Sequence, residues 1–207
     1  VFTLHDLIPL RFPEYHLPLN RIFLEAMFPR FLAQADAIIA VSEHTRRDAE
    51  ALLGIDPARI TVIPEAVEPH LQPVTDPEQL ADLRHRLGLP QTYILCLCTI
   101  EPRKNHSTLL RAWAQIAAEF PGVALVLAGK PGWLYQDFFA ELENSPVRQQ
   151  VILTGRVAEA DLAGLLSGAA IFAFPSLYEG FGLPPLEAMA CGTATIVADS
   201  SSLPEAI

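Results

Sequence analysis

The run of residues with the clearest chemical potential extends from Glu179 to Glu187 and reads Glu-Gly-Phe-Gly-Leu-Pro-Pro-Leu-Glu. Two glycines followed by two prolines predict a tight loop that leads into a helix, so free backbone N–H groups gather at the helix start and favour an anion. The carboxylates of Glu179 and Glu187 can accept hydrogen bonds from paired hydroxyls, as ribose and hexose diols require. The alternative is that Glu179 is solvated and that Glu187, near the first helical turn, only complements the helix dipole.

A second candidate site is the run Glu101-Pro102-Arg103-Lys104-Asn105, which lies between an expected strand and an expected helix. Arginine and lysine beside a helix N-terminus, at the carboxyl edge of a parallel sheet, suit a diphosphate. The only two lysines, Lys104 and Lys130, both follow expected strands, and residues 151–207 hold six acids and one base. Phosphate charge in that region must therefore be met from Arg103 and Lys104. The alternative is a surface turn with ordinary solubilising charge.

Two weaker features complete the set of candidate residues. Gly155-Arg156-Val157 follows an expected strand and could offer backbone groups to a nucleotide base, although a plain strand-to-helix turn explains it equally well. His5-Asp6 follows the apolar run Val1–Leu4 and could face a cleft, with Asp6 orienting the imidazole. The alternative is a packed or surface histidine and an aspartate that caps a turn.

The three cysteines, Cys96, Cys98 and Cys191, predict neither a disulfide framework nor a metal site. The first two lie in an apolar run, where free cysteine behaves as a small hydrophobe. An odd count without C-x-x-C or a nearby histidine favours a reducing compartment over a disulfide scaffold or a zinc site. The chain also has no D-x-D triplet, so a metal that neutralises a diphosphate has no obvious ligands.

Composition excludes several classes of protein. The formal net charge of −10 rules out a generally basic nucleic-acid binder. Hydrophobic residues make up 51% and charged residues 18%, which supplies a core and excludes disorder. The longest uncharged run, residues 162–178, is broken by glycines and a proline, whereas a spanning helix needs about 20 apolar residues. No transmembrane segment or signal peptide is therefore expected.

The elements that must position these residues follow a repeated strand-then-helix order, which predicts an α/β, doubly wound parallel sheet. Strands buried on both faces are apolar at every position. Five runs fit that description: Tyr93–Cys98, Val123–Ala128, Val151–Leu153, Ile171–Phe174 and Thr195–Ala198. Helical patterning separates and follows them in four stretches: Ser107–Phe120, Trp133–Glu143, Glu159–Ser167 and Pro184–Ala190.

The first part of the chain resembles the tail of a second unit of the same kind. Val1–Leu4 and Ala37–Val41 are expected strands, and Thr45–Leu53 is an expected helix closed by Gly54. Prolines at 64, 69 and 73 place the domain boundary after residue 68, and a linker with a helix from Asp76 fills residues 69–92. The chain opens on a strand without an initiator methionine and closes where a helix would begin, so a fragment is expected.

At these residues the sequence resembles the retaining family 4 glycosyltransferases of the two-Rossmann GT-B architecture. The motifs that carry the resemblance are Glu179…Glu187 with the intervening Gly180-Phe181-Gly182-Leu183, the Arg103–Lys104 loop, Gly155-Arg156-Val157, Glu187-Ala188-Met189-Ala190-Cys191-Gly192 and His5-Asp6. The resemblance implies that residues 1–68 end the acceptor-binding N-domain and that residues 93–207 form the nucleotide-sugar domain, truncated at its C-terminus. The Glu101–Asn105 string is similar to that of bacterial mannosyltransferase-like members of polysaccharide biosynthesis.

The resemblance also implies a reaction: transfer of a hexose from a nucleotide diphosphate sugar, with GDP-mannose favoured, to an acceptor hydroxyl with retention of anomeric configuration. Glu187 would hold the ribose, Glu179 the hexose, and the amides of Gly180, Phe181, Gly182 and Leu183 the phosphate and sugar oxygens. Arg103 and Lys104 would stabilise the charge on the departing diphosphate. His5 would position donor or acceptor, and neither metal nor cofactor is expected.

The expected partners are the sugar donor and a saccharide or lipid-linked acceptor, in the cytoplasm, with peripheral membrane association of the full-length enzyme left open. Nucleic acid is not an expected partner. Two other functions remain as alternatives. One is a non-catalytic nucleotide-sugar-binding fragment. The other is a glycan phosphorylase of the same architecture, which needs pyridoxal phosphate on a lysine.

Overall fold

The computed structural model describes residues 1–15 and 18–207, and these divide into two compact units. The first unit comprises residues 1–66, 177–183 and 199–207, and the second comprises residues 67–176 and 184–198. Two late segments of the chain therefore group with the first unit. The expected boundaries at residues 68 and 93 stay predictions.

The second unit is built on a five-stranded parallel sheet in the order β6-β5-β4-β7-β8. The strands are β4 (Thr92–Leu97), β5 (Val123–Ala128), β6 (Val151–Gly155), β7 (Ile171–Phe174) and β8 (Thr195–Val197). In the central strand, Leu95 pairs with Val126 on one side and with Phe172 on the other, and all three side chains are fully buried. The expectation of an α/β, doubly wound parallel sheet is confirmed.

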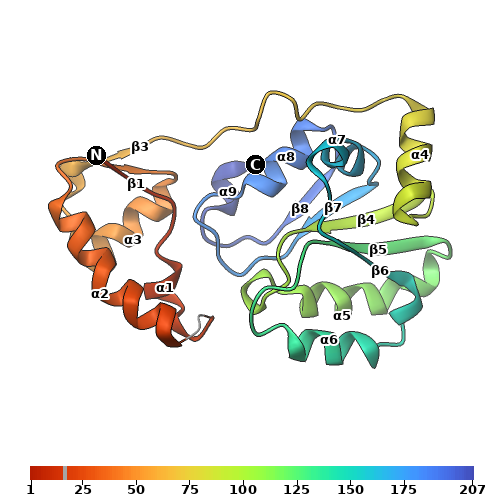
Figure 1. Cartoon of the computed structure of the whole chain (residues 1–207), viewed down its shortest axis with the longest axis horizontal. Helices are drawn as coiled ribbons and strands as arrows, with labels where there is room; N and C mark the ends of the chain where they lie inside the picture. The colour runs from red at the N-terminus through yellow and green to blue at the C-terminus, as the bar shows by residue number, and fades with distance from the viewer. Residues whose placement is uncertain (16–17) are drawn as a thin grey trace. The chain divides into compact units, whose positions relative to one another are not determined.

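Helices cover both faces of this sheet. Figure 1 shows α5 (His106–Ile116) and α6 (Gln136–Glu143) together on one side, with α7 (Glu159–Ser167) and α8 (Leu183–Ala190) on the other. Leu110 and Trp113 of α5 pack with Phe138 of α6 and with buried strand side chains into one hydrophobic core. This core fixes the carboxyl ends of β4 and β5 relative to the helices that follow them.

The opposite face is packed closely because of small residues on α7. A Cβ added at Gly164 would lie 2.8 Å from the side chain of Leu83 in α4 (Pro77–Leu87). The hydroxyl of Tyr93 donates a 2.7 Å hydrogen bond to the carbonyl of Leu165. Asp76 caps α4 at its start, and Gly88 ends it in the left-handed conformation, as the sequence predicts.

The first unit contains a three-stranded parallel sheet in the order β1-β2-β3. Its strands are β1 (Phe2–Leu4), β2 (Ile38–Ala40) and β3 (Ile60–Val62), and its helices are α1 (Ile8–Arg11), α2 (Pro18–Gln34), α3 (Glu43–Leu53) and α9 (Leu203–Ala206). Single 3-10 turns are η1 (Pro13–Tyr15) and η2 (Pro57–Arg59) here, and η3 (Pro102–Lys104), η4 (Ala117–Glu119) and η5 (Arg148–Gln150) in the second unit.

The core of the first unit lies between its sheet and its helices. Leu4, Ile38 and Ala49 are buried in it, and Ser42 caps α3 by accepting a hydrogen bond from the N–H of Thr45. Two elements of this unit, α2 and β3, are not predicted by the sequence pattern. No helix in the described part of the chain is both long and apolar enough to cross a membrane.

Candidate functional site

A pocket of about 670 Å³ opens at the carboxyl ends of β4 and β5. Its lining includes three cationic side chains, those of Arg103, Lys104 and Lys130, together with Trp133. The carboxyl edge of a parallel sheet is where α/β folds bind their ligands, because the loops and helix N-termini that follow the strands converge there. The pocket thus combines the expected position with positive charge.

The loop after β4 is held in place by hydrogen bonds to the loop after β7. The Asn105 side chain donates to the carbonyl of Pro175 at 3.1 Å, and the Ser176 hydroxyl donates to the carbonyl of Arg103 at 3.3 Å. Asn105 adopts a left-handed conformation, with φ 58°, which lets the chain pass directly from η3 into α5. The ammonium of Lys104 lies 5.1 Å from the centre of the Phe174 ring, within cation–π range.

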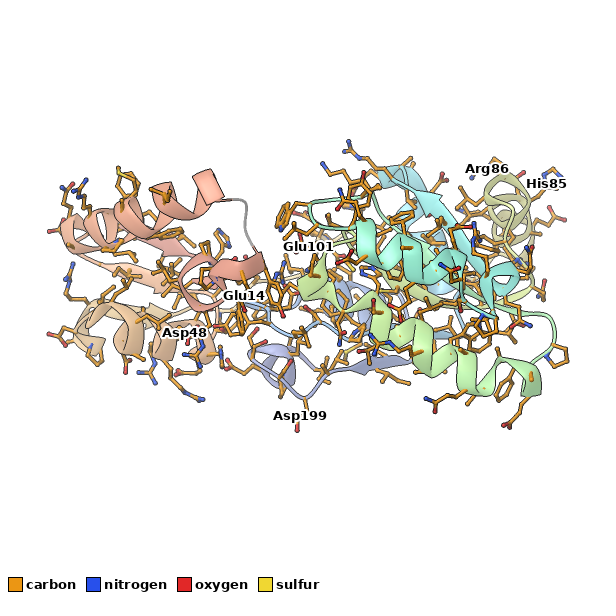
Figure 2. The ribbon with its side chains drawn as sticks, turned by 90° about the horizontal axis from the view of Figure 1, so that it is seen from below. Glu14, Asp48, His85, Arg86, Glu101 and Asp199 are labelled. Atoms are coloured by element: carbon orange, nitrogen blue, oxygen red, sulfur yellow. The ribbon has the colours of Figure 1, made fainter. Side chains whose placement is uncertain are left out.

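Arg103 is paired within its own loop, a feature that the sequence analysis missed. Its guanidinium donates a 2.6 Å hydrogen bond to Glu101, and the two side chains are only 12% and 2% exposed. Figure 2 shows Glu101 beside η3. The Glu101 carboxylate therefore offsets the charge of Arg103 in this structure, while the remaining guanidinium donors keep a fixed orientation.

A second pocket, of about 420 Å³, adjoins the first because both are lined by Cys98, Thr99 and Lys130. Arg156 and Val157 line this second pocket, so the structure brings them to the same sheet edge as Arg103 and Lys104. Lys130 was noted in the sequence only as a residue after a strand. That position was the signal that could have identified it as the third cation of the site.

Two glycines fix the backbone at the carboxyl ends of β5 and β6, and one of them, Gly129, lines the second pocket. Gly129 has φ 146°, and a Cβ added there would lie 1.9 Å from the carbonyl oxygen of Cys98, so only glycine fits. Gly155 ends β6 with φ 67°, and its carbonyl accepts a 2.8 Å hydrogen bond from the Gly129 N–H. The carbonyl of Gly155 is thus engaged in the fold.

Glu187 lies past the first turn of α8, because the helix already begins at Leu183 and its first turn holds two prolines. Glu187 directly follows that turn, so it lies near the first turn as expected, but its placement outside the turn weakens the helix-dipole explanation. The carboxyl is half-buried, and this burial raises its pKa. The charge of Glu159, a residue of the second pocket, raises the pKa further, whereas His70 lowers it.

The remaining predicted residues belong to the first unit. Glu179 is buried, so it is not a solvated surface group. Its N–H donates to the Ser201 hydroxyl at 2.9 Å, and its carbonyl accepts from the Ser202 hydroxyl at 2.9 Å. The carbonyl of Phe181 lies 2.8 Å from the same hydroxyl, so the two carbonyls share its single proton. The segment just ahead of α9 therefore fixes the backbone of residues 179–183, the glycine loop.

Gly180 is held against the start of α3. Its carbonyl accepts hydrogen bonds from the hydroxyls of Ser42 at 2.6 Å and Thr45 at 3.0 Å. A Cβ added at Gly180 would lie 1.8 Å from the carbonyl oxygen of His5, so the close approach requires glycine. Gly182 also needs glycine, because its φ is 123°. The two glycines of the motif thus serve the shape of the loop itself.

His5 has a partner that the sequence analysis did not identify. Its Nδ1 lies 2.8 Å from a carboxylate oxygen of Glu65, and its side chain is exposed. Asp6 instead accepts a hydrogen bond from the N–H of Ile8 at 3.0 Å, in the turn that leads into α1, whose N-cap residue is Leu7. The capping alternative for Asp6 is therefore the observed one.

The view that the cysteines lack a nearby histidine is wrong. Cys98 Sγ lies 3.5 Å from Nε2 of His106 and 3.8 Å from Sγ of Cys96. The hydrogen bond between the thiols lowers the pKa of Cys98 and raises that of Cys96. Histidine follows eight residues after Cys98, and only the turn of η3 brings the ring back to the strand.

Comparison with known proteins decides the family. The family model described as "Glycosyl transferases group 1" matches residues 81–207, and "Glycosyltransferase Family 4" matches residues 1–71. The chain belongs to the glycosyl transferases group 1 family. Both pockets lie within residues 81–207, the part of the chain that the first of these models matches.

Similar proteins include bacterial mannosyltransferases and D-inositol 3-phosphate glycosyltransferases. The chain is 38% identical to a serotype-specific mannosyltransferase WbdA from Escherichia coli over all of its length, which is 26% of that protein. It is 34% identical to the O-antigen chain mannosyltransferase B of Escherichia coli, covering 55% of that protein. This glycosyltransferase chain thus spans between a quarter and just over half of the relatives' length.

Solved structures agree with the fold of the family. Anabaena Alr3699/HepE, in complex with UDP and glucose, superposes with a TM-score of 0.80 at 26% identity, covering 99% of this chain and 54% of that one. WaaG, a glycosyltransferase involved in lipopolysaccharide biosynthesis, gives a TM-score of 0.77 at 17% identity, which bears on the fold alone. Both agree with a GT-B glycosyltransferase architecture.

Proposed function

We propose that this glycosyltransferase moves a hexose from a nucleotide diphosphate sugar to an acceptor hydroxyl, with retention of anomeric configuration. The observation that carries the proposal is the pocket lined by Arg103, Lys104 and Lys130 at the carboxyl ends of β4 and β5. Three cations in one pocket suit the two phosphates of such a donor. Mannose is the favoured sugar, because the named relatives include two mannosyltransferases.

The adjoining pocket suits the nucleoside. Its wall contains Arg156 and Val157 beside Lys130, so a diphosphate held by the lysine has a neighbouring space for its nucleoside. Glu187 is the proposed ribose ligand, since its carboxylate can accept two hydrogen bonds from a diol. This assignment rests on the family resemblance, because Glu187 is not among the residues that line either pocket.

The cations would act mainly in the transition state. Negative charge grows on the departing diphosphate, so fixed positive groups stabilise the transition state more than the bound donor. The departing phosphate oxygen would accept the proton of the attacking hydroxyl on the same face of the sugar. In this proposal protein cations take the place of a metal ion, so transfer should proceed without added Mg²⁺ or Mn²⁺. The proposal is contradicted if a chelator abolishes turnover and added Mg²⁺ restores it.

The residues of the first unit have proposed roles by family resemblance. Glu179 would accept hydrogen bonds from the hexose hydroxyls, the Gly180–Leu183 amides would bind phosphate and sugar oxygens, and His5 would position donor or acceptor. The acceptor is proposed to be a saccharide or a lipid-linked saccharide. The proposal includes a reducing, cytoplasmic setting, which the three free thiols support.

Ligand-dependent stabilisation tests the donor site directly. A ligand that binds only the native state raises the melting temperature as its concentration rises. We expect GDP and GDP-mannose to raise it more than guanosine does, and UDP and ADP serve as the alternative bases. Trp133 lines the cationic pocket and Trp113 lies in the core, so nucleotide should change the fluorescence of Trp113→Phe but not of Trp133→Phe.

Turnover separates the enzyme from a module that only binds nucleotide. Radiolabelled donor is supplied with a mannose-terminated acceptor, and both transfer and donor hydrolysis are followed. Binding without either reaction, in a protein extended to the relatives' full length, would favour the non-catalytic alternative. Equal stabilisation by guanosine and by GDP would reject the cationic pocket as the diphosphate site.

A further inference from the structure

Cys96, Cys98 and His106 form a compact group of soft ligand atoms beside the cationic pocket. Their two sulfur atoms and one ring nitrogen all lie within 4.8 Å of one another. The two thiols are 3.8 Å apart, and Nε2 of His106 is 3.5 Å from Sγ of Cys98. In a tetrahedral zinc site with Zn–S near 2.3 Å and Zn–N near 2.0–2.1 Å, the S···S and S···N edges are about 3.8 and 3.6 Å. The two distances therefore match those edges.

Local structure explains why the three atoms converge. Cys96 is in β4 and Cys98 directly follows the last residue of that strand, two positions further along the extended backbone, which places their sulfur atoms on the same side. His106 is the first residue of α5, which returns over that face after the turn of η3. The sheet and the helix are joined by a shared hydrophobic core, so the arrangement is set by packing rather than by a mobile loop.

The surroundings suit a soft cation. Cys96 is fully buried and His106 is 3% exposed, with the Phe138 ring 5.4 Å from the imidazole. Cys98 is partly exposed and lines both pockets, which gives an ion a route to the group. Nδ1 of His106 has no protein partner that would force the ring proton onto Nε2, so Nε2 can offer its lone pair.

We propose that Cys96, Cys98 and His106 bind a thiophilic divalent cation of the Zn²⁺ class, with a small donor such as water as the fourth ligand. Each thiol loses its proton to solvent as its sulfur–metal bond forms, so two thiolates balance the charge of the ion. The oxygen-seeking Mg²⁺ is excluded by ligand type. The ion would tie β4 to α5 behind the loop that carries Arg103 and Lys104, a structural role separate from the proposed transfer reaction.

Cobalt substitution tests the site without reference to activity. Co²⁺ occupies the same tetrahedral sites as Zn²⁺, and thiolate ligation produces a sulfur-to-cobalt charge-transfer absorption. We expect the reduced whole chain to bind one equivalent of Co²⁺ with that absorption, and Zn²⁺ but not Mg²⁺ to displace it. Absence of the charge-transfer band would overturn the proposal and would show a cluster held only by hydrogen bonds.

Variants identify the ligands. Cys98→Ser is the least disruptive change, because this residue is partly exposed. It should weaken Co²⁺ binding by more than about tenfold, since a change in a residue that only hydrogen-bonds a metal ligand already costs that much. His106→Gln should do the same. Cys191→Ser is the matched control, since Cys191 is also a buried free cysteine but lies outside the cluster. Retained affinity in Cys98→Ser, with a native circular dichroism spectrum, would overturn the assignment.

Zinc protection provides a second measurement that does not need a stable variant. Bound Zn²⁺ should slow alkylation of Cys98 by iodoacetamide at least about tenfold, as followed by mass spectrometry of the peptides, and should raise the melting temperature. The rate at Cys191 should stay unchanged. Equal alkylation rates of Cys98 with and without Zn²⁺ would contradict the proposal. The donor site is tested separately, by nucleotide binding.

Discussion

Lys130 extends the positive wall of the candidate donor pocket that Arg103 and Lys104 begin. The Glu101 carboxylate offsets much of the Arg103 charge, so the two lysines carry a larger share of any attraction for phosphate than the sequence motif suggests. A charge-assisted hydrogen bond is stronger than a neutral one, and truncating its donor should be measurable in binding.

Lys130→Ala should therefore weaken nucleoside diphosphate binding about tenfold or more, because hydrogen bonds to charged groups contribute roughly 1.5–3 kcal/mol. Nucleoside binding should change little, since it lacks phosphate. Calorimetry measures both affinities. Arg111→Ala is the matched control, because this exposed arginine of the same unit pairs with Glu141 away from the cationic pocket. Equal losses for nucleoside and diphosphate would reject the role of Lys130.

The raised pKa of Glu187 predicts how donor binding responds to pH. The carboxyl takes up a proton at a higher pH than an ordinary glutamate, and a protonated carboxyl holds a ribose diol less well. Ribonucleotide affinity should then fall as the pH is lowered through this raised pKa. Glu187→Gln should bind more weakly, with this pH dependence removed, and His70→Gln should move the fall in affinity to higher pH, because His70 lowers the pKa of Glu187. A 2′,3′-dideoxynucleotide that showed the same profile would contradict the ribose assignment.

The buried pair of Glu101 and Arg103 predicts a loss of stability when only one partner is removed. Glu101→Ala leaves a buried guanidinium without its carboxylate, and breaking such a pair costs about 3–5 kcal/mol of unfolding free energy. Replacing both residues, Glu101→Ala with Arg103→Met, should recover part of this loss. Urea denaturation measures the difference, and a double variant less stable than Glu101→Ala would show that the pair is not the cause.

At the scale of elements, the floor of the site depends on how closely β4 and the end of β5 approach each other. Gly129→Ala places a Cβ against the carbonyl of Cys98 and should cost clearly more than the roughly 1 kcal/mol of an unstrained glycine change. Gly122→Ala is the matched control, because Gly122 also has a positive φ but has open space around it. Similar melting temperatures for the two variants would mean that β4 and β5 can separate without cost.

The sequence predicted the elements of the second unit well because buried parallel strands are apolar at every position. Two elements of the first unit were missed for identifiable reasons. The helix α2 contains Pro29, and its apolar residues do not follow one stripe, while β3 has three residues directly after a proline-bearing turn. Proline inside a helix normally argues against that helix.

The candidate site was predictable only as far as local sequence determines it. Arg103 and Lys104 follow a strand in sequence, so their place at the sheet edge could be inferred. The partners Glu101 for Arg103, Glu65 for His5 and His106 for Cys98 depend on side-chain packing. Residue spacing alone does not fix such contacts, because they form only once loops and helices have packed.

At the scale of the whole molecule, the glycine loop belongs to the first unit, although the chain segments before and after it belong to the second. Tyr178 hydrogen-bonds Asp48 of α3 in the first unit, and the rings of Phe12 and His44 lie 5.1 and 5.2 Å from its own. Burial raises the pKa of Asp48. Aromatic packing and this buried polar contact thus add to the hydrogen bonds that Ser42 and Thr45 donate to the loop at Gly180.

Tyr178→Phe keeps the ring contacts and removes the hydroxyl, so it isolates the polar contact. Leaving a buried acceptor without this donor should cost about 1–3 kcal/mol of unfolding free energy and should speed proteolytic cleavage near the loop. Asp48→Asn is the comparison, because it keeps an acceptor and should lose less. Wild-type stability and cleavage in Tyr178→Phe would show that the hydroxyl does not hold the loop.

Each unit is built from separate stretches of the chain, and this limits which segments can be exchanged with those of a related protein. The backbone passes from one unit to the other after residues 66, 176, 183 and 198. A hybrid joined once near residue 67 would pair the Leu177–Leu183 loop with a foreign α3. Gly180 would then need a new Ser42 and Thr45, and Tyr178 a new Asp48. Successful chimaeras of this protein should therefore inherit the start of α3 from the same parent as the glycine loop.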